Sequence, residues 1–294
     1  MLDKQMGRRS FLKYSAAAAM GVTLAGTSGA ATTAEKNKKW YKALKIGMLP
    51  KELPDAEKFK LAKRCGFEGI DGIPVSDRSR AEKQAELARN IGVPIHGLVY
   101  GWWPPFDAKA EVIKKSLEEM EKALRCANVM GATTVLLVPT KVTETFRYAD
   151  AYEQSQKHIR RLLPLAKEMG VIIAVENVWN KFLLSPLEFA RYIDELESPY
   201  ARAYFDTGNV IIDGYAQDWI RTLGKRIVKL DLKDFRRKDY KWTNLGDGDV
   251  NWPEVCQSLN EVGFEGYMTA ELASGDEAYL SDLAKRIDRL MNLN

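Results

Sequence analysis

The chain has 294 residues, of which 46% are hydrophobic and 29% charged, and this composition excludes a disordered chain and allows a full hydrophobic core. The formal net charge is +4, and residues 1–30 supply three of these charges through Lys4, Arg8, Arg9 and Lys13 against Asp3. The rest of the chain is therefore nearly neutral, and its bulk charge gives no support for binding nucleic acid.

The N-terminus carries the features of an export signal. Residues 7–13 read Gly-Arg-Arg-Ser-Phe-Leu-Lys, which resembles the twin-arginine signal, and an alanine-rich stretch and a small-residue cleavage site at residues 28–31 follow. The apolar stretch is too short and too interrupted to span a membrane comfortably. The sequence therefore predicts a cleavable signal peptide over residues 1–30, a linker over 31–42, and a periplasmic mature protein without a membrane span.

From residue 45 onward, a short apolar run, a loop and an amphipathic helix repeat eight times. The expected strands are residues 45–49, 69–73, 94–100, 133–139, 171–178, 201–207, 227–234 and 267–272. The expected helices are residues 55–65, 81–90, 109–130, 149–169, 185–197, 216–225, 252–262 and 276–291. Several of these helices are followed directly by glycine, and two begin with proline in the first turn, as helix ends require.

Eight alternating strands and helices in about 250 residues predict a single α/β domain over residues 43–294, folded as a closed parallel (β/α)8 TIM barrel. An open doubly wound sheet is the alternative. The sequence lacks both glycine-rich nucleotide-binding fingerprints after the first expected strand, which disfavours that alternative. The three cysteines are far apart and form no CxxC motif, so we expect buried thiols rather than disulfides or a thiolate metal site.

Four consecutive expected strands each carry an acid at or near the C-terminal end: Glu176, Asp206, Asp231 and Glu271. In a TIM barrel these ends meet at the catalytic face. A carboxylate inside an apolar strand is costly unless it is paired or bound to a metal, and four together would repel one another without a cation. All-oxygen ligands favour Mg²⁺ or Mn²⁺ over Zn²⁺. The sequence therefore predicts a divalent-metal site formed by these four side chains.

At these residues the sequence resembles the xylose isomerase-like TIM-barrel superfamily of sugar isomerases and epimerases, which includes the ketose 3-epimerases. The resemblance covers about residues 43–290. It rests on Glu176, on Asp206-Thr207-Gly208-Asn209, on Leu232-Lys233-Asp234, on Glu271, and on the glycine-rich stretch at residues 245–252. It implies a sugar isomerase or epimerase that acts on a small-molecule sugar, which we expect to be unphosphorylated because the protein is exported.

One residue departs from the family pattern. Where the family has a histidine ligand this chain has Asp231, which adds a negative charge to the site. Lys229, two residues earlier on the same face of the strand, or Lys233 can offset that charge. Asp231 can also reach the metal through a water molecule. Metal affinity and metal identity therefore depend on how Asp231 takes part in the site.

The resemblance also implies a mechanism. A metal that chelates a carbonyl and a neighbouring hydroxyl acidifies the adjacent C–H bond, and one of Glu176 and Glu271 removes that proton to give an enediolate. The other glutamate returns a proton to the opposite face, or the same base returns it to the neighbouring carbon. The sequence does not say which glutamate is the base.

Six further residues are candidates for binding the substrate. His96 is in the third expected strand, and an aromatic run follows it at residues 100–106. Aromatic side chains suit the apolar faces of a sugar ring. Lys233 can pair with Asp234 or hydrogen-bond the substrate. The candidates are His96, Trp102, Trp103, Trp179, Asn209 and Lys233, of which Trp179 and Asn209 follow the acids of the fifth and sixth strands.

Three other functions are considered. Apurinic-site endonucleases of the same superfamily need several histidines for a multi-zinc site, and this chain has two histidines, so that function is disfavoured. A lyase or hydratase acting on a keto-sugar or keto-glycoside would use the same proton abstraction followed by loss of a substituent. A sugar-binding protein without catalysis would bind without proton exchange. The sequence leaves a homodimer open.

Overall fold

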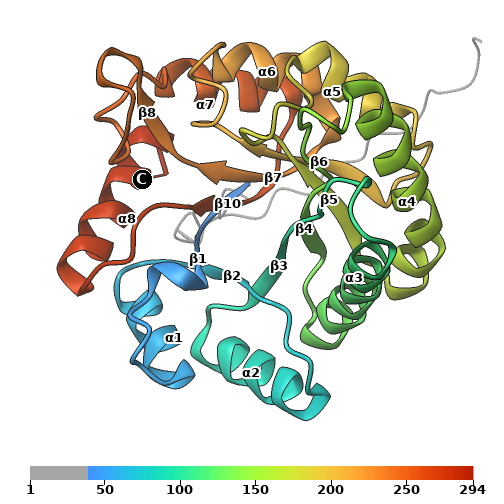
Figure 1. Ribbon diagram of the computed structural model, residues 1–294. Coiled ribbons are helices and arrows are strands. Elements are labelled where there is room, and N and C mark those ends of the chain that lie inside the picture. The colour runs from blue at the N-terminus through green and yellow to red at the C-terminus, as the bar shows by residue number, and fades with distance from the viewer. Residues whose placement is uncertain (1–38, 294) are drawn as a thin grey trace, which may run out of the picture. The chain divides into compact units, whose positions relative to one another are not determined.

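The computed structural model describes residues 39–293, so the expected signal peptide over residues 1–30 lies outside the described residues. Eight parallel strands form one closed barrel, with each strand hydrogen-bonded to the next along the chain and the last barrel strand, β10, paired with β1. Figure 1 shows the helices arranged around the outside of this barrel. The predicted (β/α)8 fold is confirmed, and the open doubly wound sheet is excluded.

The elements have the following bounds. The barrel strands are β1 (Trp40–Lys45), β2 (Gly69–Gly72), β3 (Ile95–Trp102), β4 (Thr134–Val138), β5 (Ile172–Glu176), β6 (Ala201–Asp206), β7 (Ile227–Leu232) and β10 (Gly266–Ala270). The helices are α1 (Asp55–Arg64), α2 (Arg78–Ile91), α3 (Ala110–Met130), α4 (Tyr148–Met169), α5 (Pro186–Asp194), α6 (Ala216–Leu223), α7 (Trp252–Val262) and α8 (Glu277–Met291).

The prediction of the first strand is wrong in position. The strand is Trp40–Lys45, and the residues after it, Ile46–Met48, form a short 3-10 helix instead of the expected strand. The strand therefore begins inside the segment 31–42 that was expected to be a linker. Two lysines in the strand, Lys42 and Lys45, interrupt its apolar pattern, although both are buried by ion pairs with aspartates. Because the charges of these two lysines are paired only in the folded structure, a search for apolar runs in the sequence does not detect this strand.

The helices follow the expected boundaries closely because their ends carry clear capping signals. Ser185 and Asn251 accept a hydrogen bond from a backbone N–H in the first turn of α5 and α7. Gly131 adopts a φ of 76° after α3, a left-handed conformation that glycine tolerates best. The three cysteines are buried and free, as expected. Within the described part of the chain, no helix is long and apolar enough to cross a membrane.

A short antiparallel hairpin, β8 (Asp234–Arg236) and β9 (Lys241–Thr243), follows β7 and was not predicted. Its first residue holds the next loop in place. Oδ1 of Asp234 accepts hydrogen bonds from the backbone N–H groups of Phe235 and Val250, and Oδ2 accepts from Gly246 N and Trp252 Nε1. This one carboxylate therefore joins the hairpin to the start of α7.

Replacing Asp234 with alanine should destabilise the protein strongly. Each buried donor left without an acceptor costs about 1–3 kcal/mol, so the loss of several should lower the free energy of unfolding by at least about 3 kcal/mol. Urea denaturation followed by circular dichroism measures this. As a control, Asp247→Ala removes a carboxylate whose ion pair with Arg286 is half exposed, and it should cost less than about 1 kcal/mol. Equal stability of the two variants would contradict this role of Asp234.

Candidate active site

The four predicted carboxylates converge at the C-terminal end of the barrel. Glu176 and Asp206 end β5 and β6, Asp231 is the fifth residue of β7, and Glu271 directly follows β10. Each offers one oxygen atom, and these atoms lie within 4.8 Å of one another. Three of the side chains are buried, and Glu271 is partly exposed. The sequence argument that acids on neighbouring parallel strands meet at one point is therefore consistent with the structure.

Backbone groups of the turn after β6 fix the position of Asp206. Its Oδ1 accepts hydrogen bonds of 2.8 Å from the backbone N–H groups of both Gly208 and Asn209. The side-chain amide of Asn177 spans to the same strand, accepting from Asp206 N at 2.9 Å and donating to Asp206 O at 3.1 Å. Gly208 has no room for a side chain, because a Cβ there would lie 2.5 Å from Cβ of Lys233. The Asp-Thr-Gly-Asn motif is thus explained by local geometry.

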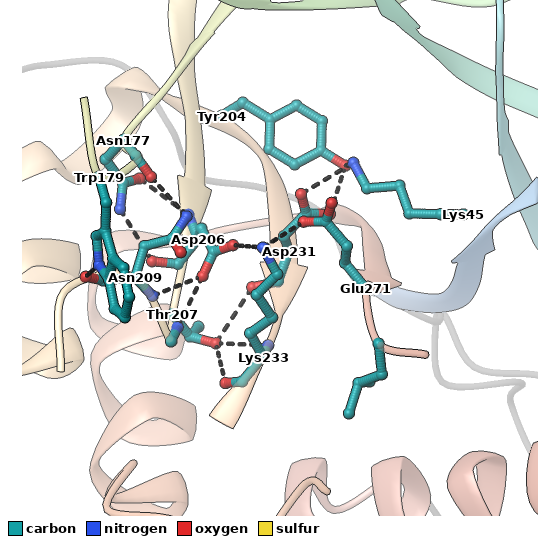
Figure 2. A network of polar contacts seen from close by, with 12 residues as sticks. Lys45, Asn177, Trp179, Tyr204, Asp206, Thr207, Asn209, Asp231, Lys233 and Glu271 are labelled. Atoms are coloured by element: carbon teal, nitrogen blue, oxygen red, sulfur yellow. Dashed lines mark hydrogen bonds and ion pairs between the residues drawn. The ribbon is translucent and has the colours of Figure 1, made fainter. Parts of the chain in front are cut away.

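Lys233 lies between two of the acids rather than beside Asp234. Its Nζ is 3.1 Å from Oδ2 of Asp206 and 2.8 Å from Oε2 of Glu271, as Figure 2 shows. The expected alternative of a Lys233–Asp234 pair is wrong, because backbone and indole N–H groups engage both oxygens of Asp234. Lys233 therefore offsets charge inside the cluster, as one of the two sequence hypotheses proposed.

The additional charge of Asp231 is offset by a lysine that the sequence did not single out. Nζ of Lys45, at the end of β1, lies 2.9 Å from Oδ2 of Asp231 and 3.3 Å from Oδ2 of Asp71. The other candidate, Lys229, does not contact Asp231, because its Nζ lies 2.7 Å from Nδ1 of His96. Lysines at the ends of β1 and β7 thus supply the positive charge at the site.

Tyr204 and Asp71 complete the environment of Asp231. The Tyr204 hydroxyl lies 2.6 Å from Oδ2 of Asp71 and 2.9 Å from Oδ1 of Asp231. Both residues were missed, although the sequence carries signals for them. Tyr204 is two residues before Asp206 and so points to the same face of β6. Asp71 is an acid inside the apolar strand β2, which is the criterion that identified the other four.

Burial and mutual repulsion shift the proton affinities of the acids in different directions. Burial, with repulsion from Glu271, raises the pKa of Glu176 well above its usual range. Burial also raises the pKa values of Asp206 and Asp231, against the attraction of Lys233 and Lys45. For Glu271, burial acts upward as well, but the two lysines outweigh it and lower its pKa. The two glutamates therefore have different affinities for a proton.

The donor set fits a divalent cation. Three carboxylate oxygens of the cluster are buried and accept no hydrogen bond: Oδ2 of Asp206, Oδ2 of Asp231 and Oε2 of Glu271. Their polar contacts are ion pairs with the ammonium groups of Lys233 and Lys45. Among the described residues, Glu176 pairs with no lysine or arginine. Lys45 and Lys233 offset only part of the negative charge of the four acids, and Lys45 is shared between Asp231 and Asp71. A divalent cation would neutralise two further charges, and carboxylate oxygens are suitable ligands for it.

A cavity of about 630 Å³ lies beside the cluster. Its lining includes Lys233 and Glu271 from the cluster, Trp242 from the hairpin, and Tyr279 from α8. The ring of Trp242 lies under the Lys233 ammonium, 5.3 Å from Nζ. The cavity is large enough for a small organic molecule and brings it next to the acids. Trp242 was not among the predicted substrate-binding residues, because the hairpin that carries it was not predicted.

The predicted substrate-binding residues do not all lie together. Trp179 is 39% exposed at the mouth, and its Nε1 donates to the backbone oxygen of Asn209 at 2.8 Å. Trp102 is 51% exposed, but Trp103 is 1% exposed and packs against Phe106, so Trp103 is not available as a wall for a ligand. This corrects the expectation for Trp103, whose ring belongs to the core.

His96 lies deeper in the barrel than expected. It is the second residue of β3, and its ring stacks at 4.0 Å on Tyr267, the second residue of β10. Burial and the neighbouring Lys229 lower the pKa of His96 well below its usual range, so the ring is neutral near pH 7. The other histidine, His158, stacks on Phe106 in a packing role.

Comparison with known proteins places this geometry in a family. A family model described as xylose isomerase-like TIM barrel matches residues 59–290. The chain is 25% identical over 248 residues to an Escherichia coli K12 protein named "Putative L-ribulose-5-phosphate 3-epimerase SgbU", covering 76% of this chain and 85% of that protein. It is also 22% identical over 285 residues to an inosose dehydratase of Clostridium perfringens, covering 82% of this chain and 93% of that protein.

Solved structures share the fold at low identity. A D-psicose 3-epimerase crystallised in the presence of D-fructose superposes with a TM-score of 0.70 at 14% identity, covering 85% of this chain and 99% of that one. A 3-keto-D-glucoside 4-epimerase of Escherichia coli superposes with a TM-score of 0.71 at 15% identity, covering 87% and 99%. The epimerases among these relatives support an isomerase or epimerase activity. The chain belongs to the xylose isomerase-like TIM barrel family.

Proposed function

We propose that this protein is a divalent-metal-dependent sugar isomerase or epimerase that moves a proton beside a carbonyl group. The observation that carries this proposal is the convergence of four carboxylate oxygens within 4.8 Å at the mouth of the barrel, next to a cavity of about 630 Å³. The epimerases among the relatives support the same class of reaction. Glu176, Asp206, Asp231 and Glu271 would hold the metal, and their oxygen donors favour Mg²⁺ or Mn²⁺ over Zn²⁺.

Bound there, a divalent cation supplies Lewis-acid polarisation of a substrate carbonyl, which acidifies the adjacent C–H bond. The protein supplies the proton transfers. Glu176 on β5 and Glu271 after β10 are separated in the barrel by β6 and β7, which carry the two aspartates. We therefore expect the two glutamates to approach the substrate from different sides. One removes the proton and the other returns one, as an epimerisation requires.

A second candidate is a lyase or dehydratase on a keto-sugar, and the inosose dehydratase among the relatives favours it. The first step is the same proton abstraction. The reaction then continues with the departure of a substituent on the neighbouring carbon, for which the same pair of glutamates provides a base and an acid. The products distinguish the two reactions, because epimerisation conserves the mass of the sugar and dehydration removes one water.

Incubation with unphosphorylated ketoses and 3-keto-glycosides in D₂O tests the proposed function. With Mg²⁺ or Mn²⁺ present, mass spectrometry should show incorporation of deuterium into a sugar, and a chelator should abolish it. Glu176→Gln and Glu271→Gln should each slow exchange by at least about 100-fold, because each removes a proton-transferring group. Glu168→Gln, an exposed glutamate on α4, is the control and should exchange normally. Metal-independent exchange, or full exchange in both active-site variants, would contradict the proposal.

The pairing of Lys45 with Asp231 predicts a coupling in stability that needs neither metal nor substrate. Lys45→Met leaves a buried carboxylate without its counter-charge and should lower the free energy of unfolding by about 3–5 kcal/mol. The double variant Lys45→Met/Asp231→Asn should lose less than the sum of the single losses, by at least about 1 kcal/mol. Chemical denaturation of all four proteins measures this coupling.

Lys42 provides the matched control for this cycle. It lies on the same strand and is 8% exposed, as is Lys45, but it pairs with Asp288. The losses from Lys42→Met and Asp231→Asn should therefore add. If Lys45→Met and Asp231→Asn were also additive, Lys45 would not be the residue that offsets the charge of Asp231.

We further propose that the protein is exported by the twin-arginine pathway and meets unphosphorylated sugars in the periplasm, on the basis of residues 7–13. In a bacterium with this pathway, the periplasmic fraction should contain a product shortened by about 30 residues. The double substitution Arg8→Lys/Arg9→Lys should keep the protein in the cytoplasm, as seen on immunoblots of the fractions. The matched variant Lys4→Arg/Lys13→Arg should be exported. Export of the Arg8→Lys/Arg9→Lys protein would contradict this proposal.

A further inference from the structure

A second cavity, of about 300 Å³, lies on the other side of the aromatic residues at the mouth. Its lining includes Asn177, Trp179, Lys181, Leu184, Asn209 and Tyr240. Asn177 directly follows Glu176, and the backbone N–H of Asn209 donates to Oδ1 of Asp206. Two residues of this lining are therefore linked to acids of the carboxylate cluster, although none of the four acids lines the second cavity. In Figure 2, Asn177, Trp179 and Asn209 lie on the side of Asp206 opposite to Glu271.

A stacked pair of tryptophans connects the two cavities. Trp242 lines the larger cavity together with Lys233 and Glu271, and Trp179 lines the second. The two rings stack with centroids 4.9 Å apart and an interplanar angle of 27°. Phe235 packs edge-on against both of them. This wall is built from the loop after β5 and from the β8–β9 hairpin, and it leaves an aromatic surface facing each cavity.

Several residues that line the second cavity have a strained backbone conformation. Among the described residues, five that are not glycine have a positive φ, and three of them, Lys181, Leu183 and Tyr240, line this cavity with φ between 55° and 59°. The other two, Glu197 and Asn292, follow the ends of α5 and α8. Side chains other than glycine and asparagine rarely adopt this conformation, and such strain clusters at ligand sites. The strained residues shape the cavity with large side chains where glycine would relieve the strain.

The chemistry of the lining suits a carbohydrate. Trp179 and Tyr240 are 39% and 61% exposed and offer ring faces for the C–H groups of a sugar. Lys181 and Asp213 are exposed at the same cavity and form no ion pair with any described residue. Their charged groups can hydrogen-bond hydroxyls. A combination of aromatic faces with a few polar groups is typical of small-molecule sites.

We propose that the second cavity binds a second sugar ring, so that the substrate is a disaccharide or a longer glycoside rather than a free monosaccharide. This inference rests on the proposed function, because it assigns the reacting ring to the carboxylate cluster and the larger cavity. The non-reacting ring packs on Trp179 and Tyr240 and hydrogen-bonds Asp213 or Lys181. Trp242 and Tyr240 of the same hairpin line the larger and the second cavity, and a glycoside that extends past this hairpin would occupy both.

Binding measurements with the whole protein test this assignment. Tryptophan fluorescence titrations would use glucose, fructose and galactose as monosaccharides, and cellobiose, maltose, lactose and sucrose as disaccharides. At least one disaccharide should bind about tenfold more tightly than its component monosaccharides. Tyr240→Asn, which keeps a residue that tolerates positive φ, and Asp213→Ala should each reduce this advantage about three- to tenfold. Neither should change monosaccharide binding, because both residues lie away from the cluster.

Tyr215→Ala is the matched control, because Tyr215 is also 61% exposed and does not line the second cavity. It should leave all affinities unchanged. If monosaccharides bind and no disaccharide binds more tightly, the second ring is rejected while the proposed function stands. If no sugar binds and no deuterium is exchanged, both are rejected. If phenyl glucoside binds more tightly than every disaccharide, the cavity takes an apolar group, and the second sugar ring is rejected.

Discussion

The structure of the mouth depends on how two lysines are placed among four carboxylates. A buried carboxylate without a counter-charge costs several kcal/mol, and four of them within 4.8 Å could not remain ionised together. Lys233 lies between Asp206 and Glu271, and Lys45 contacts Asp231. Lys45 ends β1 and Lys233 directly follows β7, so the ends of non-adjacent strands must keep their register for the cluster to form. Barrel closure between β1 and β10 is therefore a condition for the chemistry.

The lysines also explain how an aspartate can occupy the position at which the family resemblance implies a histidine. Aspartate is shorter and charged, and each property is compensated nearby. Lys45 supplies the charge, and the hydroxyl of Tyr204 fixes the second oxygen at 2.9 Å. Asp71 in turn engages both Lys45 and Tyr204. Contacts among residues of four strands therefore hold this aspartate, so the departure from the family pattern involves several residues and not Asp231 alone.

The sequence predicted the parts of this site that follow from periodicity. An acid at the end of an apolar run can be recognised in the sequence, and parallel strands bring such ends together. The four carboxylates and the barrel could therefore be predicted. The first strand was misplaced because Lys42 and Lys45 look polar in sequence and are buried by partners 246 and 186 residues away. The hairpin was missed because Asp234 stabilises it through loop N–H groups rather than through an apolar pattern. Contacts between residues that are far apart in the chain leave no pattern in the local sequence from which they could be predicted.

The mouth of the barrel consists of the charged strand ends and the aromatic wall, and different interactions determine the structure of each. In the proposed function, the residues that react are therefore separate from those that limit the size of the substrate. In the proposed function, charge balance among residues at the strand ends fixes where a cation and a reacting carbon can lie, and it tolerates little change because three of the four acids are buried. The aromatic wall belongs to the β8–β9 hairpin and the loop after β5, whose rings are partly exposed and contact the cluster only at its edge. Changes in the wall can alter which sugar fits without disturbing the acids. In the proposed function, the features that assign a reaction class are therefore at the strand ends, whereas those that would select the substrate are in the loops.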